Sequence, residues 1–209
     1  MVSIPKDELK RKAFHQLTLI YVFGYLWLPV STVLWGLGIA AFIITVFETV
    51  RLTVPKVNEL FTERFHGFYR SDEINKPSGL FGTVTGAFLT ILIFDLIFQE
   101  KAMVFASFLY LAFGDAAAAL VGRTVGEHKM FSGKSWEGSA ACFIVCLICG
   151  LFIFDWKFAV AGALIATAVE AVPWKINDNF WMQIINAGLL CFLALILYPG
   201  VTAGALLLK

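Results

Sequence analysis

Seven apolar runs constrain the fold of this chain more than any other feature. A bilayer supplies no hydrogen bonds to a backbone, so runs of about 20 apolar residues cross it as helices. With 59% hydrophobic and only 15% charged residues, the composition excludes an ordinary soluble domain. The sequence therefore predicts an all-α integral membrane protein with about seven transmembrane helices. The runs cover about residues 14–30, 33–50, 80–98, 102–121, 139–154, 158–172 and 180–197.

The basic residues predict which way the chain crosses the membrane. If the N-terminus is inside, thirteen Lys and Arg residues fall on the inner side, and only Lys101, Lys157 and Lys209 fall outside. Cytoplasmic connections carry such an excess, so we expect a cytoplasmic N-terminus and a C-terminus on the opposite side of an inner or internal membrane. The three long polar connections, 51–79, 122–138 and 173–179, then share the cytoplasmic face. Function is expected on that face, because loops commonly carry binding residues.

The 51–79 connection predicts an amphipathic helix in the membrane interface. Pro55 suits the first turn of a new helix rather than the continuation of the second span. One face then carries Val57, Leu60, Phe61, Phe65 and Phe68, and the other carries Lys56, Glu59, Glu63 and Arg70.

Asp115 is the first candidate functional residue, because it follows about thirteen apolar residues and precedes more. A carboxylate in a span is costly unless a cation neutralises it, and a hard divalent cation prefers oxygen ligands. The alternative is a cap, or a buried partner of Arg123. Glu170 and Asp178-Asn179 flank another inner connection and could complete a magnesium site, although Asn177-Asp178-Asn179 alone suits a turn or an N-cap.

The segment Lys134-Ser135-Trp136-Glu137-Gly138-Ser139 opens the fifth run. Ser135 and Glu137 could cap a helix, and the same helix start beside Lys134 could hold phosphate. The two roles are compatible. Lysine and arginine suit phosphate, and glycine allows a backbone to approach it, so the region predicts a nucleotide–metal site at the membrane surface.

Five motifs together resemble the CTP-dependent polyprenol kinases, which comprise dolichol kinase, phytol kinase and a CTP-using diacylglycerol kinase. Most specific is the block from Gly114-Asp115-x-x-Ala118 with Gly122 to Lys134-Ser135-x-Glu137-Gly138-Ser139. The segment Asn177-Asp178-Asn179-Phe180-Trp181 departs from the family pattern, since Asn177 stands where an acid is expected and Trp181 where a proline is expected. The supporting motifs are Arg11-Lys12-x-x-His15, Arg70-x-x-Glu73 with Ser78-Gly79, and Glu170 with Asp178-Asn179.

This resemblance implies one lipid-kinase-like domain over residues 1–209, which phosphorylates a long-chain lipid alcohol of the polyprenol, dolichol, phytol or geranylgeraniol type. CTP would be the donor and Mg²⁺ the cofactor, with membrane lipids as surroundings and no nucleic acid as partner. The general base stays open among Glu137, Asp115 and His15. The implied metal ligands are Asp115, Glu170, Asp178 and Asn179, the catalytic residues Asp115, Lys134, Glu137 and His15, and the nucleotide-binding residues Gly114, Gly122, Arg123, Lys129, Lys134, Ser135, Gly138, Ser139, Arg70 and Glu73.

Two other functions are compatible with parts of this pattern. A phosphatidate cytidylyltransferase would also need acids, magnesium and a basic cytoplasmic loop, but no Lys-Arg-x-x-x-x-Lys-Asp run follows Gly114-Asp115. A small-solute transporter could use Asp115 as an ion or proton site. Transporters of that kind often carry internal repeats and charges at mid-membrane, whereas here no repeat is visible and the polar residues gather at one face.

Overall fold

The fold is given by a computed structural model that describes residues 18–65, 71–130, 133–174 and 177–198. Its regular secondary structure is helical throughout these ranges, which confirms the all-α prediction. The α-helices are α2 (Thr18–Trp27), α3 (Val30–Thr53), α4 (Pro55–Arg64), α5 (Gly79–Thr90), α6 (Lys101–Leu109), α7 (Ala116–Thr124), α8 (Trp136–Leu151), α9 (Trp156–Ala171) and α10 (Asp178–Leu197). A 3-10 turn, η1 (Ser71–Asn75), and two π-helical segments, η2 (Ile91–Ile97) and η3 (Tyr110–Asp115), complete the list.

Among the residues that the structure describes, four helical stretches are long and apolar enough to cross a membrane: Val30–Thr53, Gly79–Ile97, Lys101–Thr124 and Asp178–Leu197. The chain is therefore an integral membrane protein. The other three predicted runs also coincide with helices, namely α2, α8 and α9, but α2 has 10 residues and α8 and α9 have 16 each. The count of seven spans stays a prediction.

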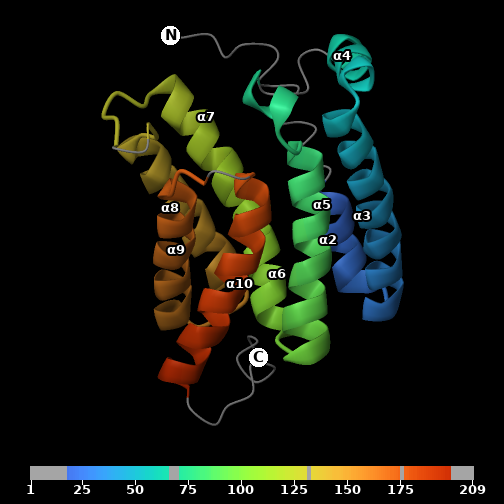
Figure 1. Cartoon of the computed structure of the whole chain (residues 1–209). Helices are drawn as coiled ribbons and strands as arrows, with labels where there is room; N and C mark the ends of the chain where they lie inside the picture. Colours follow the sequence, from blue (N-terminus) through green and yellow to red (C-terminus); the bar gives the residue numbers. More distant parts are fainter. Residues whose placement is uncertain (1–17, 66–70, 131–132, 175–176, 199–209) are drawn as a thin grey trace.

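The bundle has two lobes that share central helices (Figure 1). Helices α2, α3 and α5 lie on one side, α7, α8 and α9 lie on the other, and α6 and α10 lie between them. One buried cluster, which includes Tyr110, Phe158 and Leu190, joins α6 and η3 to α8, α9 and α10. A second, with Val22 and Phe108, joins α2, α3 and α5 to α6. Side chains from α6 enter both clusters, so this helix ties the lobes together.

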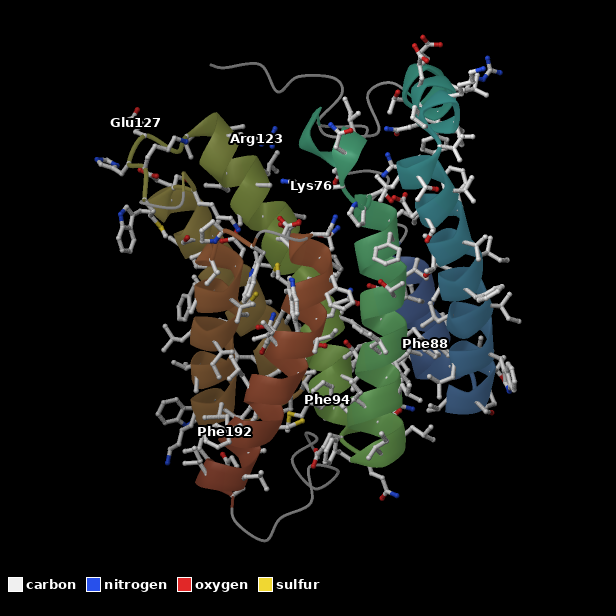
Figure 2. All side chains as sticks on the ribbon, viewed as in Figure 1. Lys76, Phe88, Phe94, Arg123, Glu127 and Phe192 are labelled. Carbon is white, nitrogen blue, oxygen red and sulfur yellow. The ribbon has the colours of Figure 1, made fainter. Side chains whose placement is uncertain are left out.

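The polar connections gather at one end of the bundle, as the basic residues predicted. Figure 1 shows α4, η1 and the α7–α8 connection at one end and the turn between α5 and α6 at the other. Figure 2 shows Lys76, Arg123 and Glu127 at the same end as α4, with Phe94 and Phe192 toward the opposite end. This grouping agrees with a shared membrane face for connections 51–79 and 122–138. That the face is cytoplasmic stays a prediction.

A buried ion pair fixes the connection that follows α4. Arg51 is fully buried, and its Nη2 lies 2.6 Å from Glu48 Oε2. The Arg51 guanidinium also donates to Asn58 Oδ1 at 2.8 Å and to the main-chain oxygen of Lys76 at 2.7 Å. Glu48 in turn accepts from the Ser78 N–H at 3.3 Å. The pair therefore holds α4 and the segment before α5 against the end of α3.

The predicted helix in connection 51–79 exists and starts at Pro55, which occupies its first turn. It is shorter than the sequence pattern suggests, since α4 ends at Arg64. Phe68 and Arg70, which were assigned to its two faces, lie outside the described residues. The position of α4 in a membrane interface stays a prediction.

Thiol labelling tests the orientation of the bundle. We replace Lys129 or Lys157 by cysteine in a background without the 4 native cysteines. An impermeant thiol reagent on intact cells should label only the Lys157→Cys protein, because connection 122–138 is predicted inside. Both proteins should react after permeabilisation, which controls for exposure of the thiols. Labelling of Lys129→Cys from outside would show that the predicted orientation of the protein in the membrane is inverted.

Candidate active site

A cavity of about 210 Å³ collects charged residues that are distant in the sequence. It lies between α7, the start of α8, the end of α9 and the start of α10. Three acids and three bases face it together with small residues. The lining is Asp115, Ala118, Ala119, Gly122, Arg123, Lys129, Gly133, Lys134, Ser135, Gly138, Ser139, Glu170 and Asp178.

Most of the candidate site residues line this cavity. Those that do so are Asp115, Gly122, Arg123, Lys129, Lys134, Ser135, Gly138, Ser139, Glu170 and Asp178. Gly114, Glu73, Glu137 and Asn179 do not line it. His15 and Arg70 lie outside the described residues. The juxtaposition of the ten residues is an observation, whereas their individual roles stay predictions.

Asp115 enters the cavity from a modified stretch of helix. It ends the π-helical segment η3, which joins α6 and α7 into one continuous helix. Such π turns are rare and occur often at functional sites, because the extra residue redirects the side chains that follow. Asp115 is only 7% exposed. A β-carbon on the preceding Gly114 would lie 2.5 Å from Cys146 Sγ, so this glycine allows η3 to pack against α8 and thereby places Asp115.

The α7–α8 connection folds back on itself and presents two lysines to the cavity. Lys129 and Ser135 form an antiparallel bridge. The Met130 N–H donates to the Lys134 main-chain oxygen at 2.7 Å, and the Trp136 N–H donates to that of His128 at 3.0 Å. Gly133 has φ +79°, a left-handed conformation that favours glycine at a tight turn. This geometry places Lys129 and Lys134 in the same cavity lining.

Glu137 anchors this connection to α8. Its Oε1 accepts from the His128 N–H at 3.2 Å and lies 2.5 Å from His128 Nδ1. The hydrogen bond with the His128 side chain is the main cause that lowers the pKa of Glu137 to about 2. A general base works best when its pKa is near the working pH, so a carboxylate held this acidic is a poor one. The geometry favours a positioning role for Glu137 over a catalytic one.

The Glu137→Gln variant should separate these two roles. If Glu137 positions the lysine-bearing connection, the substitution raises the KM for nucleotide about tenfold more than it lowers kcat, because binding residues are displaced. A lost general base would instead lower kcat by about 10²–10⁴-fold. The depressed pKa means that the anchor is present above about pH 4.5 and is lost only as the pH falls toward 2. The wild-type rate should therefore show no titration of Glu137 between pH 5 and pH 8, and steady-state kinetics on both proteins check these outcomes.

The start of α8 faces the cavity with its own donors mostly satisfied. Ser135 Oγ accepts from the Gly138 N–H at 3.1 Å, so Ser135 is the N-cap of this helix. Its hydroxyl proton remains able to donate to a ligand, and the helix dipole favours an anion there. Ser139 Oγ donates to Met130 Sδ at 3.6 Å, a weak acceptor that a phosphate oxygen would replace readily. Gly138 and Gly122 let α7 and α8 approach, since a β-carbon on Gly138 would lie 2.7 Å from the Ala118 main-chain oxygen.

The three acids of the cavity influence one another. Glu170 is 5% exposed, and the negative charges of Asp115 and Asp178 both act on it. Lys134 Nζ lies 2.7 Å from Glu170 Oε1 and also donates to the Glu170 main-chain oxygen. Within the described ranges, no three His, Cys, Asp or Glu side chains are grouped as a self-contained metal site.

This acid set suits magnesium that arrives with a nucleotide. Mg²⁺ is usually held by one or two carboxylates together with substrate phosphates, rather than by a cage made of protein alone. The three acids supply oxygen ligands for the metal, and the three bases supply positive charge for the phosphates. The fit is therefore to a metal–phosphate complex.

Asn179 and Glu73 occupy other places. The Asn179 side-chain amide donates to Thr83 Oγ1 in α5 at 3.1 Å, and its N–H donates to Asn177 Oδ1 at 3.0 Å. Asn177 thus caps α10, as the turn alternative proposed, while Asp178 faces the cavity. Glu73 is buried beside Gly79, and its main-chain oxygen accepts from Arg51 at 3.3 Å. It belongs to the group around Arg51 rather than to the cavity lining.

Sequence reasoning did not single out Glu48 or His128, and it counted Arg51 only as a topology charge. The sequence does carry a signal for the pair Glu48–Arg51, because an acid inside an apolar run with an arginine three residues later fits an ion pair on one helix face. No comparable signal connects His128 with Glu137, because they lie nine positions apart with a turn between them.

Comparison with known proteins places this geometry in a family. The chain is 32% identical over 155 residues to CTP-dependent diacylglycerol kinase 1 of Saccharomyces cerevisiae, a match that covers 71% of this chain and 51% of that protein. It is 28% identical to the protein of the same name from Schizosaccharomyces pombe, over 88% of this chain and 93% of that one. An uncharacterized Rickettsia prowazekii protein is 30% identical, over 82% of this chain and 87% of its own length. No family model and no solved structure matches the chain.

Two of these relatives are named as CTP-dependent diacylglycerol kinases, which are lipid kinases. The chain belongs to the CTP-dependent lipid kinase family that includes the diacylglycerol kinases named above. It spans about half the length of the Saccharomyces cerevisiae protein that it matches.

Proposed function

We propose that this protein transfers the γ-phosphoryl group of CTP to the hydroxyl group of a membrane lipid at the cytoplasmic face. One observation carries the proposal: three acids and three bases meet in a cavity among membrane-spanning helices. Phosphoryl transfer needs little covalent help from the protein and depends on positioning and charge stabilisation. The names of the relatives support CTP as the donor.

The lining residues divide into those that would bind the triphosphate and one that would accept the proton of the lipid hydroxyl. Arg123 and Lys129 would bind the triphosphate, and the hydroxyls of Ser135 and Ser139 would donate to its oxygens. The lipid oxygen forms a bond to the γ-phosphorus, the bond from that phosphorus to the β–γ bridging oxygen breaks, and CDP leaves. Asp115 is the candidate to take the hydroxyl proton, because Glu137 is held by His128.

Magnesium would neutralise the charge that develops on the phosphate oxygens. Asp115, Glu170 and Asp178 are the residues proposed to hold it. Asn179 remains the weakest of the four ligands implied by the family resemblance, since its side chain binds Thr83.

The size of the cavity suggests which part of the nucleotide it takes. Pockets that enclose a whole drug-sized ligand measure about 300–1,000 Å³. At about 210 Å³, this cavity suits the phosphates and the metal, with the base outside it. The preference for CTP is therefore proposed on the names of the relatives and not on the shape of the cavity.

Diacylglycerol is the first acceptor to test, because the named relatives are diacylglycerol kinases. Polyprenol, dolichol, phytol and geranylgeraniol are the alternatives that the wider family resemblance implies. All of them place a hydroxyl at the membrane surface and a tail in the lipid, which suits a site at the proposed cytoplasmic face.

The purified protein should be incubated with CTP, ATP, GTP or UTP and each lipid in turn, and the products should be identified by mass. The proposal expects CDP and a phosphorylated lipid. Pyrophosphate with a CDP-lipid, formed when phosphatidate is supplied in place of the lipid alcohol, would identify a cytidylyltransferase instead. Absence of any phosphorylated lipid with an active preparation, shown by binding of Mg²⁺ and CTP together, would reject the kinase proposal.

A further inference from the structure

The ion pair between Lys134 and Glu170 belongs to the lining of the candidate site. Lys134 Nζ lies 2.7 Å from Glu170 Oε1, and the two side chains are 27% and 6% exposed. Both residues line the cavity. Each is thus engaged with the other at the place where a phosphate and a metal would need them.

The pair also satisfies both charges in the structure as it stands. Glu170 interacts with the negative charges of Asp115 and Asp178, and Lys134 is the cation that offsets them. Drawing Lys134 toward a phosphate alone would leave the Glu170 carboxylate without its cation partner. Drawing Glu170 toward a metal alone would leave Lys134 without its carboxylate partner. Binding of either ligand alone is therefore unfavourable, because an uncompensated charge in a mostly buried site is costly.

We propose that this ion pair makes the site selective for the metal–nucleotide complex over either component. When both arrive, the phosphate replaces Glu170 as the partner of Lys134, and the divalent cation replaces Lys134 as the partner of Glu170. Both charges then stay compensated throughout. This inference rests on the proposed function, and it adds that neither free CTP nor free Mg²⁺ binds well to the resting protein.

The bond of Lys134 to the Glu170 main-chain oxygen limits the movement that the exchange requires. This oxygen lies in the last turn of α9, where carbonyls have no partner within the helix. It can keep Lys134 beside α9 while the Glu170 carboxylate turns away. The exchange therefore needs a change of side-chain partner and not a movement of helices.

The inference predicts crossed effects in binding measurements with separate components. In EDTA, Glu170→Gln should bind CTP about tenfold more tightly than wild type, within the usual range of coupling between sites. Without nucleotide, Lys134→Met should bind Mg²⁺ about tenfold more tightly than wild type, because Glu170 is released. Isothermal titration of the purified protein in detergent measures both affinities, with no need for turnover.

Matched controls separate this exchange from a simple change of net charge. Asp178→Asn also removes one carboxylate from the cavity, and Lys129→Met also removes one base, but neither residue belongs to the pair. In EDTA, Asp178→Asn should tighten CTP binding clearly less than Glu170→Gln does. Without nucleotide, Lys129→Met should tighten Mg²⁺ binding clearly less than Lys134→Met does. If Asp178→Asn and Glu170→Gln tighten CTP binding equally, only the net charge matters and the exchange is rejected.

A third titration, of wild type with Mg²⁺ and CTP together, keeps the two proposals apart. If the complex binds but Glu170→Gln and Lys134→Met leave the separate affinities unchanged, the selectivity inference is wrong and the proposed function stands. If wild type binds neither the complex nor its components, the nucleotide site itself is rejected. Tight binding of free CTP by wild type in EDTA would also overturn the inference.

Discussion

We expect Asp115→Asn to lower the rate of lipid phosphorylation about a hundredfold to a thousandfold, the usual cost of removing a preorganised electrostatic group. The substitution keeps the size of the side chain but removes the charge that a hard cation prefers. Asp115 is buried and lines the cavity, so the charge is lost at the place where the cation is proposed to bind. Release of CDP at saturating CTP and lipid measures the effect.

Asp95→Asn is the matched control, because Asp95 is also a carboxylate in a candidate span, the stretch Gly79–Ile97. Its Oδ2 accepts from the Tyr25 hydroxyl at 2.7 Å, a bond that asparagine can retain. This variant should keep most of the activity. If Asp115 were a structural partner of Arg123, then Asp115→Asn and Arg123→Ala would both lower thermal stability in detergent. Near-normal turnover by a folded Asp115→Asn protein would end the assignment of Asp115 to the metal or the hydroxyl proton.

The largest expected effect on stability comes from Arg51→Leu. This change leaves the Glu48 carboxylate buried without its guanidinium and also removes the donors that hold the oxygen of Lys76 and the side chain of Asn58. Removing one partner of a buried ion pair lowers the free energy of unfolding by about 3–5 kcal/mol. The midpoint of thermal unfolding in detergent should fall steeply, while Arg64→Leu, which removes an exposed arginine from α4, should change it little.

The double variant Glu48→Leu with Arg51→Leu tests the cause of this loss. Removing both charges avoids the uncompensated carboxylate, so it should recover part of the stability lost in the single variant. Recovery should be incomplete, because Arg51 and Glu48 also bind main-chain groups of the segment before α5. A double variant less stable than both single variants would show that the pair itself is not the source of the effect.

The sequence by itself determined the class of fold and most of the members of the site. Long apolar runs must become helices in lipid, whatever the details of packing, so the seven runs could be located along the sequence, and each overlaps a helix. Asp115 and Lys134 were identified because a charge at the border of hydrocarbon needs a reason. The basic connections were assigned to one face on the distribution of Lys and Arg, and the bundle groups connections 51–79 and 122–138 at one end.

Only the tertiary structure decided which partner each polar side chain takes. Glu137 points to His128 and Asn179 to Thr83, although both stand beside residues that line the cavity. The pairing of Lys134 with Glu170 joins residues 36 positions apart, and no periodicity encodes it. Gly114 is needed for contact with Cys146 on another helix. The physical reason is common to all of these: a helix fixes the angular spacing of its side chains, but its rotation and depth, which set what each side chain meets, come from packing against other helices.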